Sequence, residues 1–193
     1  MRRCPEFTEG RRCILILGGA RSGKSDYAQR LAAEMGEEVL FVATAGVGDE
    51  EMRRRIQKHR SARPPSWRTL EAEVGLANKL AKEAGRAEVI IIDCITLLVS
   101  NLIGEGDEVP DSSELEARVT AEIGALAEFM ERSPACFIIV SNEVGLGLVP
   151  PNPLGRVYRD ALGHANQMLA RHADEVYMMF AGIPLKLKGE ATP

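Results

Sequence analysis

An eight-residue segment, Gly18-Gly19-Ala20-Arg21-Ser22-Gly23-Lys24-Ser25, constrains the fold of this chain more than any other feature. It fits the pattern G-x-x-x-x-G-K-[S/T], and it lies between the apolar run Cys13–Leu17 and a helical pattern over Asp26–Met35. In that setting, backbone N–H groups turn inward around phosphate oxygens at the positive end of a helix. The segment predicts a P-loop for a nucleoside triphosphate, with Lys24 reaching the outer phosphates and Ser25 as a ligand of Mg²⁺.

The length and the net charge of the chain narrow further the class of protein that it can be. The chain has 193 residues, a length that suits one domain, and we expect residues 13–193 to form it behind a flexible extension, 1–12. A net charge of -4 gives no reason to expect a nucleic-acid partner. The longest apolar stretch, Val89–Val99, is interrupted by Asp93, so we expect no membrane insertion. None of the four cysteines forms a CxxC pair, which favours free thiols in the reducing cytoplasm.

Strand-like apolar runs alternate with helical patterns along the chain. The expected strands are Cys13–Leu17, Val39–Ala43, Glu88–Ile92, Cys136–Ser141 and Glu175–Phe180. Helix periodicity recurs over Asp26–Met35, Leu76–Ala84, Leu115–Met130 and Leu154–Leu169. Such alternation predicts an α/β fold with a doubly wound, mostly parallel sheet of the P-loop NTPase type.

Two local signals add detail to this fold. Ser113 and Glu116 fit a capping box at the start of the helix over Leu115–Met130. The last two runs, Glu175–Phe180 and Ile183–Lys188, are separated by Ala181-Gly182 and predict an antiparallel hairpin at one edge of the sheet.

Asp93 follows the apolar run Val89-Ile90-Ile91-Ile92, so it stands at the carboxyl end of a buried strand. Ligands of α/β sheets bind at that edge, and P-loop enzymes place a metal-supporting acid there. Asp93 also suits the N-cap of a helix over Cys94–Ile103. The local sequence leaves both roles open, and the P-loop favours Asp93 as a metal ligand, directly or through water.

Residues 49–63 read DEEMRRRIQKHRSAR and end at two prolines. If this segment is helical, Arg55, His59 and Arg63 share one face. The cations that flank His59 favour its neutral imidazole, which is a nucleophile. A solvated amphipathic helix is the alternative, and these residues alone do not decide between the two.

Other segments offer weaker signals. Trp67 suits a core position or a stacking platform, and Glu71 either accepts hydrogen bonds from a ribose or base or caps the next helix. The loop Ser141–Gly145 follows a buried strand, where a second substrate would bind. We interpret His164 and His172 as structural residues.

Several motifs together resemble one family. They are the P-loop, Arg55-Ile56…His59…Arg63-Pro64, Trp67-Arg68-Thr69…Glu71, Asn142-Glu143-Val144-Gly145 and Tyr158-Arg159-Asp160…Asn166-Gln167. Over roughly residues 14–188 the chain resembles the bifunctional adenosylcobinamide kinase / adenosylcobinamide-phosphate guanylyltransferase family of cobalamin biosynthesis.

The resemblance implies two reactions and a residue set. A phosphoryl group passes from ATP or GTP to adenosylcobinamide, and GMP from GTP then joins that phosphate through a GMP-histidine intermediate at His59. The implied nucleotide contacts are Gly18, Gly19, Ala20, Arg21, Ser22, Gly23, Lys24, Ser25, Ala43, Thr44, Ala45, Arg60, Ser61, Ala62, Arg63, Glu71 and Asp93. Ser25 and Asp93 are the implied Mg²⁺ ligands, Lys24 and His59 the catalytic residues, and a homotrimer the implied assembly.

Two other functions fit the P-loop alone. A plain small-molecule kinase would use ATP and form no covalent intermediate, which guanine-specific labelling of the protein would exclude. A non-catalytic nucleotide-binding module would bind tightly without turnover when a corrinoid is supplied.

Overall fold

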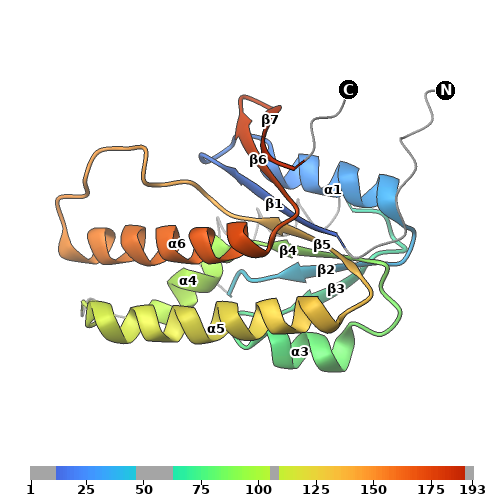
Figure 1. Cartoon of the computed structure of the whole chain (residues 1–193), viewed down its shortest axis with the longest axis horizontal. Coiled ribbons are helices and arrows are strands. Elements are labelled where there is room, and N and C mark those ends of the chain that lie inside the picture. The colour runs from blue at the N-terminus through green and yellow to red at the C-terminus, as the bar shows by residue number, and fades with distance from the viewer. Residues whose placement is uncertain (1–11, 47–62, 105–108, 190–193) are drawn as a thin grey trace.

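A seven-stranded sheet forms the middle layer of the molecule (Figure 1), seen in a computed structural model that describes residues 12–46, 63–104 and 109–189. Its strands are β1 (Cys13–Gly18), β2 (Val39–Ala43), β3 (Arg68–Glu71), β4 (Val89–Asp93), β5 (Cys136–Val140), β6 (Glu175–Phe180) and β7 (Ile183–Lys188). The spatial order is β3-β2-β4-β5-β1-β6-β7. Every neighbouring pair is parallel except β6 and β7, which are antiparallel at the edge, as predicted.

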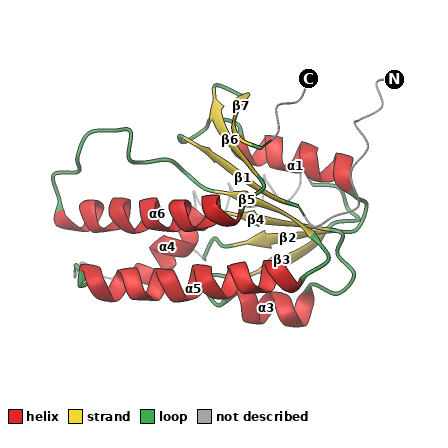
Figure 2. Ribbon diagram, viewed as in Figure 1, coloured by secondary structure: helices red, strands yellow, loops and turns green. Residues whose placement is uncertain are grey.

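Helices cover both faces of this sheet (Figure 2). They are α1 (Lys24–Met35), α3 (Leu76–Glu83), α4 (Ile95–Ile103), α5 (Ser112–Arg132) and α6 (Pro153–His172). Side chains alternate along each strand, so Ile14 and Ile16 pack with α1, while Leu15 packs with the core under the other four helices. Burial on both faces explains why the inner strands are apolar without interruption. No helix among residues 12–46, 63–104 and 109–189 is long and apolar enough to cross a membrane.

The strand register aligns the predicted site residues along one edge. Asp93 pairs with Ala43 on β2, and Ala43 in turn pairs with Glu71 on β3. On the other side of β4, Asp93 and Ile16 both pair with Val140 of β5. The parallel strands therefore end together, with β5 inserted between the P-loop strand and the strand that carries Asp93.

Two helix starts differ from simple sequence expectations. The N-cap of α5 is Asp111, whose side chain accepts from the N–H groups of Ser113 (2.9 Å) and Glu114 (3.1 Å), so the predicted cap at Ser113 was wrong. An acid two residues upstream fits the same capping pattern, and only the backbone path chooses between them. At α4 the N-cap is Cys94 and Asp93 is the last residue of β4, which excludes the capping role for Asp93.

Candidate nucleotide-binding site

The P-loop connects β1 to α1 through backbone conformations that favour glycine. Gly18 ends β1 with φ 150°, and Gly23 has φ 91° at the N-cap of α1. Both values are disfavoured for side chains with a Cβ, which explains the glycines at the two fixed ends of the motif. Between them Ser22 donates its N–H to Gly19 O (3.3 Å), which closes the turn. Arg21 also has positive φ, 57°, an unusual value for an arginine and one that recurs at ligand-binding loops.

Lys24 is held inside this loop. Its side chain is buried, and Nζ donates to Gly19 O (2.7 Å) and lies 3.5 Å from Ser22 Oγ. The ammonium group thus occupies the concave side of the turn, where phosphate oxygens would become its acceptors in place of the carbonyl. This geometry suits the predicted contact between Lys24 and the outer phosphates.

Two distant segments support the loop from outside. Gly18 O accepts from the N–H of Glu143 (3.0 Å), at the start of the connection between β5 and α6. Ser22 O accepts from the N–H of Gly182 (2.9 Å) in the turn between β6 and β7, and a Cβ on Gly23 would lie 3.2 Å from Gly182 Cα. The hairpin at the sheet edge is therefore packed directly against the P-loop.

Asp93 and Lys24 share one electrostatic neighbourhood around Cys94. Burial raises the pKa of the Cys94 thiol to about 11, the charge of Asp93 adds to the rise, and the charge of Lys24 opposes it. The Cys94 thiol therefore feels both the carboxylate of Asp93 at the end of β4 and the ammonium group of the P-loop lysine. The Asp93 carboxylate and the Ser25 hydroxyl are the hard oxygen donors that Mg²⁺ prefers, so the residues present fit this ion.

Thr44 fixes the backbone beneath Asp93. It is fully buried, its Oγ1 donates to Cys94 O (2.7 Å) and accepts from Cys94 N (2.7 Å), and its own N–H donates to Asp93 O (3.2 Å). Asn101 of α4 donates to Thr44 O (2.8 Å). With its hydroxyl bonded to the chain, Thr44 would contribute to a nucleotide site by shaping it, while its neighbours Ala43 and Ala45 are half-buried at the same edge.

Glu71 and Arg63 lie at the far end of this edge. Glu71 is exposed at the end of β3, four strands from β1, which at about 4.8 Å per strand is roughly 19 Å across the sheet. The Arg63 guanidinium lies over the ring of Phe41 (3.3 Å to its centroid) and donates to Thr69 Oγ1 (3.4 Å). The described nucleotide-binding candidates thus divide into a phosphate end at the P-loop and a second end at β2 and β3.

The predicted residues His59, Arg60, Ser61 and Ala62 lie outside the described residues. The two other histidines are on the helical layer: His164 Nε2 is 3.1 Å from Thr120 Oγ1, and His172 Nδ1 is 3.4 Å from Glu131. Sequence reasoning missed the contact of Gly182 with the P-loop, because a glycine in a hairpin turn carries no signal of what it packs against.

A polar cluster follows β5 and holds the next loop in place. Thr96 Oγ1 accepts from the N–H of Asn142 (2.7 Å), and Asn166 of α6 donates Nδ2 to Asn142 O (3.1 Å). Tyr158 of α6 donates its hydroxyl to Thr96 O (3.2 Å), and burial raises the pKa of that phenol to about 12. The loop that was predicted to receive a second substrate therefore starts from a fixed backbone.

Comparisons with known proteins identify the family of this chain. The model of the family described as cobinamide kinase / cobinamide phosphate guanyltransferase matches residues 14–187. The bifunctional adenosylcobalamin biosynthesis protein CobP of Pseudomonas aeruginosa is 46% identical over 176 residues, covering 91% of this chain and 97% of that protein. The corresponding CobU proteins of Escherichia coli and Salmonella typhimurium are 41% and 42% identical, each over 91% of this chain and 99% of the relative.

A solved structure supports the fold in turn. An ATPase domain superposes with a TM-score of 0.52 at 14% identity, over 87% of this chain and 69% of that one. At that identity the likeness concerns the fold alone. The family assignment itself rests on the family match over residues 14–187 and on the relatives at 41–46% identity: the chain belongs to the cobinamide kinase / cobinamide phosphate guanyltransferase family.

Proposed function

We propose that this chain catalyses both reactions for which its family is named. It phosphorylates the alcohol of adenosylcobinamide with ATP or GTP, and it then transfers GMP from GTP to the new phosphate, releasing pyrophosphate and giving adenosylcobinamide-GDP. The observation that supports this most strongly is that the family match over residues 14–187 includes the P-loop and His59 in one chain. A plain kinase would need the P-loop but not His59.

For the kinase reaction, the P-loop supplies position and charge. Backbone N–H groups of the P-loop would cradle the phosphates, and the buried Lys24 ammonium, which here donates to Gly19 O, would donate to phosphate oxygens instead. Ser25 and Asp93 would hold Mg²⁺, which when bound neutralises charge that develops on the phosphate oxygens. Fixed donors of this kind lower the barrier because they need no reorganisation as charge builds up.

For the guanylyl transfer, we assign the nucleophile to His59. A neutral ring nitrogen attacks the α-phosphorus of GTP, an N–P bond forms, and the bond from that phosphorus to the pyrophosphate oxygen breaks. An oxygen of adenosylcobinamide phosphate then attacks the same phosphorus and the N–P bond breaks, which restores the imidazole. The covalent intermediate divides one difficult displacement into two easier ones.

Glu71 and Arg63 complete the proposal at the other end of the sheet edge. They come from β3 and the segment before it, and the resemblance implies that both contact the guanine nucleotide. Their separation from the P-loop strand by β2, β4 and β5 means that one bound nucleotide has to extend along the edge, or move, to meet both ends. We also propose a homotrimer that works in the cytosol, where the free thiols Cys13, Cys94 and Cys136 stay reduced.

The test is product analysis with the purified protein, adenosylcobinamide, Mg²⁺ and either ATP or GTP. We expect the phosphorylated corrinoid first and the GDP-bearing corrinoid only with GTP, as identified by mass spectrometry. Lys24→Ala should lower the kinase rate by about 10²–10³-fold, the loss typical of removing one transition-state charge donor. Phosphorylated product alone would indicate a plain kinase, and no corrinoid product from protein that binds GTP would contradict the proposal.

A further inference from the structure

A cavity lies between the amino-terminal end of α5 and one face of α6, beside the loop that follows β5. Its volume is about 800 Å³, within the range of small-molecule sites. Residues that line it include Glu116, Gly145, Arg156, Arg159, Asp160 and His164. None of the residues that line it belongs to the P-loop or to the other nucleotide-binding candidates.

Glu143 connects this cavity to the P-loop. Its N–H donates to Gly18 O (3.0 Å), and its carboxylate accepts from the N–H of Gly145, which lines the cavity. The residues before it are tied as well, since Ser141 donates its N–H to Ile16 O (3.0 Å). Glu143 is therefore held between Gly18, the first residue of the P-loop, and Gly145, which lines the cavity.

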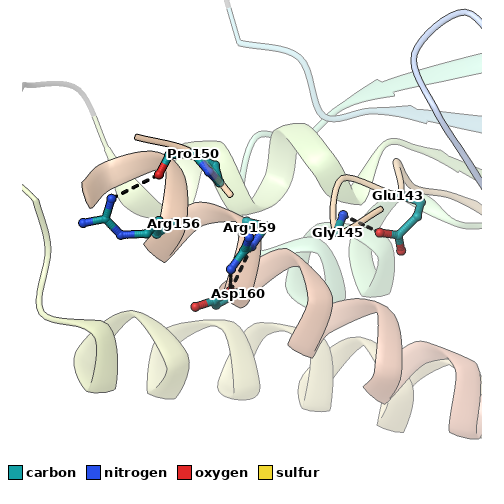
Figure 3. A network of polar contacts seen from close by, with 6 residues as sticks. All are labelled: Glu143, Gly145, Pro150, Arg156, Arg159 and Asp160. Carbon is teal, nitrogen blue, oxygen red and sulfur yellow. Dashed lines mark hydrogen bonds and ion pairs between the residues drawn. The ribbon is translucent and has the colours of Figure 1, made fainter. Parts of the chain in front are cut away.

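The cavity wall carries a guanidinium pair on one face of α6 (Figure 3). Arg156 donates from Nη1 to the carbonyls of Pro150 (3.1 Å) and Pro151 (2.8 Å), and Arg159 donates from Nε and Nη2 to Asp160 Oδ1 (3.2 Å each). The Arg159 side chain is only 22% exposed, whereas that of Asp160 is 71% exposed. Both Arg159 donors converge on one oxygen of a solvated acid, and an incoming phosphate, which can accept from both donors at once, would take the place of that oxygen.

The loop that leads into α6 adds apolar surface at this place. Leu146, Leu148 and Val149 are 77%, 96% and 63% exposed, and the loop's two ends, Gly145 and Pro153, both line the cavity. Figure 3 shows Arg159 and Asp160 between Pro150 and Gly145 in that view. Exposed apolar side chains beside the two arginines match a ligand that has a large apolar body and an anionic arm.

We propose that this cavity binds the arm of the corrinoid acceptor, with Arg159 as its phosphate contact and Glu143 as the base for the kinase step. The inference rests on the proposed function. In the step, the acceptor O–H gives its proton to the Glu143 carboxylate as its oxygen bonds to the γ-phosphorus. The bond from that phosphorus to the leaving nucleoside diphosphate breaks, and Glu143 then releases its proton to water.

The two reactions place different demands on Glu143. An alcohol has to lose its proton to become a phosphate ester, so a positioned base accelerates the kinase step. The acceptor of the second reaction is a phosphate that is already anionic and needs no base. Arg159, in contrast, meets the phosphate only after the first step, so it should matter most for binding the second acceptor.

The experiment compares three variants in three assays. Glu143→Gln and Arg159→Gln test the proposal, and Glu128→Gln is the matched control on an exposed face of α5, where it pairs with Arg132 at 3.6 Å. The assays are phosphoryl transfer from γ-³²P ATP to adenosylcobinamide, protein labelling by α-³²P GTP without acceptor, and release of that label by adenosylcobinamide phosphate. Labelling and kinase activity of the unmodified protein test the proposed function separately. If both are absent, the proposed function is wrong, and the roles of Glu143 and Arg159 are wrong with it.

We expect Glu143→Gln to lose at least about 100-fold in kinase kcat, with labelling and label release within twofold of the unmodified protein. Arg159→Gln should raise the KM for adenosylcobinamide phosphate about tenfold or more while labelling stays unchanged. Glu128→Gln should leave the kinase kcat, the labelling and the KM for adenosylcobinamide phosphate unchanged. The proposal would be overturned if Glu143→Gln kept kinase activity within threefold of the unmodified protein, or if Glu143→Gln lost its labelling by GTP. An unchanged KM for adenosylcobinamide phosphate in Arg159→Gln would overturn it as well.

Discussion

Gly18→Ala tests whether the P-loop geometry is set by backbone sterics. A Cβ at residue 18 would lie 2.7 Å from Met179 O, 2.8 Å from Ser22 Oγ and 3.1 Å from Met179 Cβ, with φ at +150°. The serine hydroxyl can rotate away, but the carbonyl belongs to β6, which is paired with β1 along its length. Either β1 and β6 separate locally or the loop leaves its conformation.

The expected cost has two parts. Forcing a methyl group into packed surroundings costs about 1–3 kcal/mol, and holding a non-glycine residue at this φ costs a similar ~1–3 kcal/mol. We therefore expect Gly18→Ala to lower the free energy of unfolding by about 2–6 kcal/mol. For a chain of this size that corresponds to a Tm lower by roughly 4–24 °C.

Gly19→Ala is the matched control, because a Cβ there has no atom within 4 Å. Its unfolding free energy should stay within about 0.5 kcal/mol of the unmodified value, as for other uncrowded surface changes. Thermal unfolding followed by circular dichroism measures both variants. A Gly18→Ala protein that melts within 2 °C of the original, or an equal loss in Gly19→Ala, would refute the steric argument.

Three further predictions concern the surroundings of the site. Thr44→Val leaves the buried N–H and carbonyl of Cys94 without the hydroxyl, so urea titration should show a loss of about 2–4 kcal/mol, and Thr44→Ser should retain most of the stability. Asn152→Ala removes the cap that accepts from Gly155 N (2.5 Å), and the same titration should show a loss of about 1 kcal/mol. Because burial raises the pKa of Cys94 from 9.0 to about 11, the unfolded chain loses that proton first as pH rises, so stability should fall between pH 9 and 11. Thermal melts across this pH range should show a Tm that falls less steeply for Cys94→Ala than for the unmodified protein. Equal slopes would contradict the assignment of this stability loss to Cys94.

Much of the fold was predictable because its signals are local. The four buried strands, the P-loop between β1 and α1 and the β6–β7 hairpin are confirmed with boundaries that shift by one residue at most. Each depends on residues that are adjacent in the chain: an uninterrupted apolar run, a glycine-rich turn, or two runs joined by Ala181-Gly182. The helix caps were less certain, since Asp111 and Ser113 both fit the capping pattern and Asp111 is the residue that caps.

The arrangement of the site was less predictable, because it depends on contacts between distant residues. No local pattern reveals that β5 lies between β1 and β4, or that Arg68–Glu71 pairs with β2 as an edge strand. The placement of Thr44 against Cys94 is of the same kind. Local sequence gave Asp93 two possible roles, and the start of α4 at Cys94 removes one of them.

The most direct test of the account is incubation of the protein with α-³²P GTP and Mg²⁺ followed by denaturing electrophoresis, for the unmodified chain and His59→Ala. We expect label on the unmodified protein that is lost in acid and survives base, as a phosphoramidate does, and no label on the variant. Absence of label on unmodified protein that binds GTP would contradict the covalent guanylyl transfer and would leave a P-loop kinase. Equal labelling of His59→Ala would show that another residue carries the GMP.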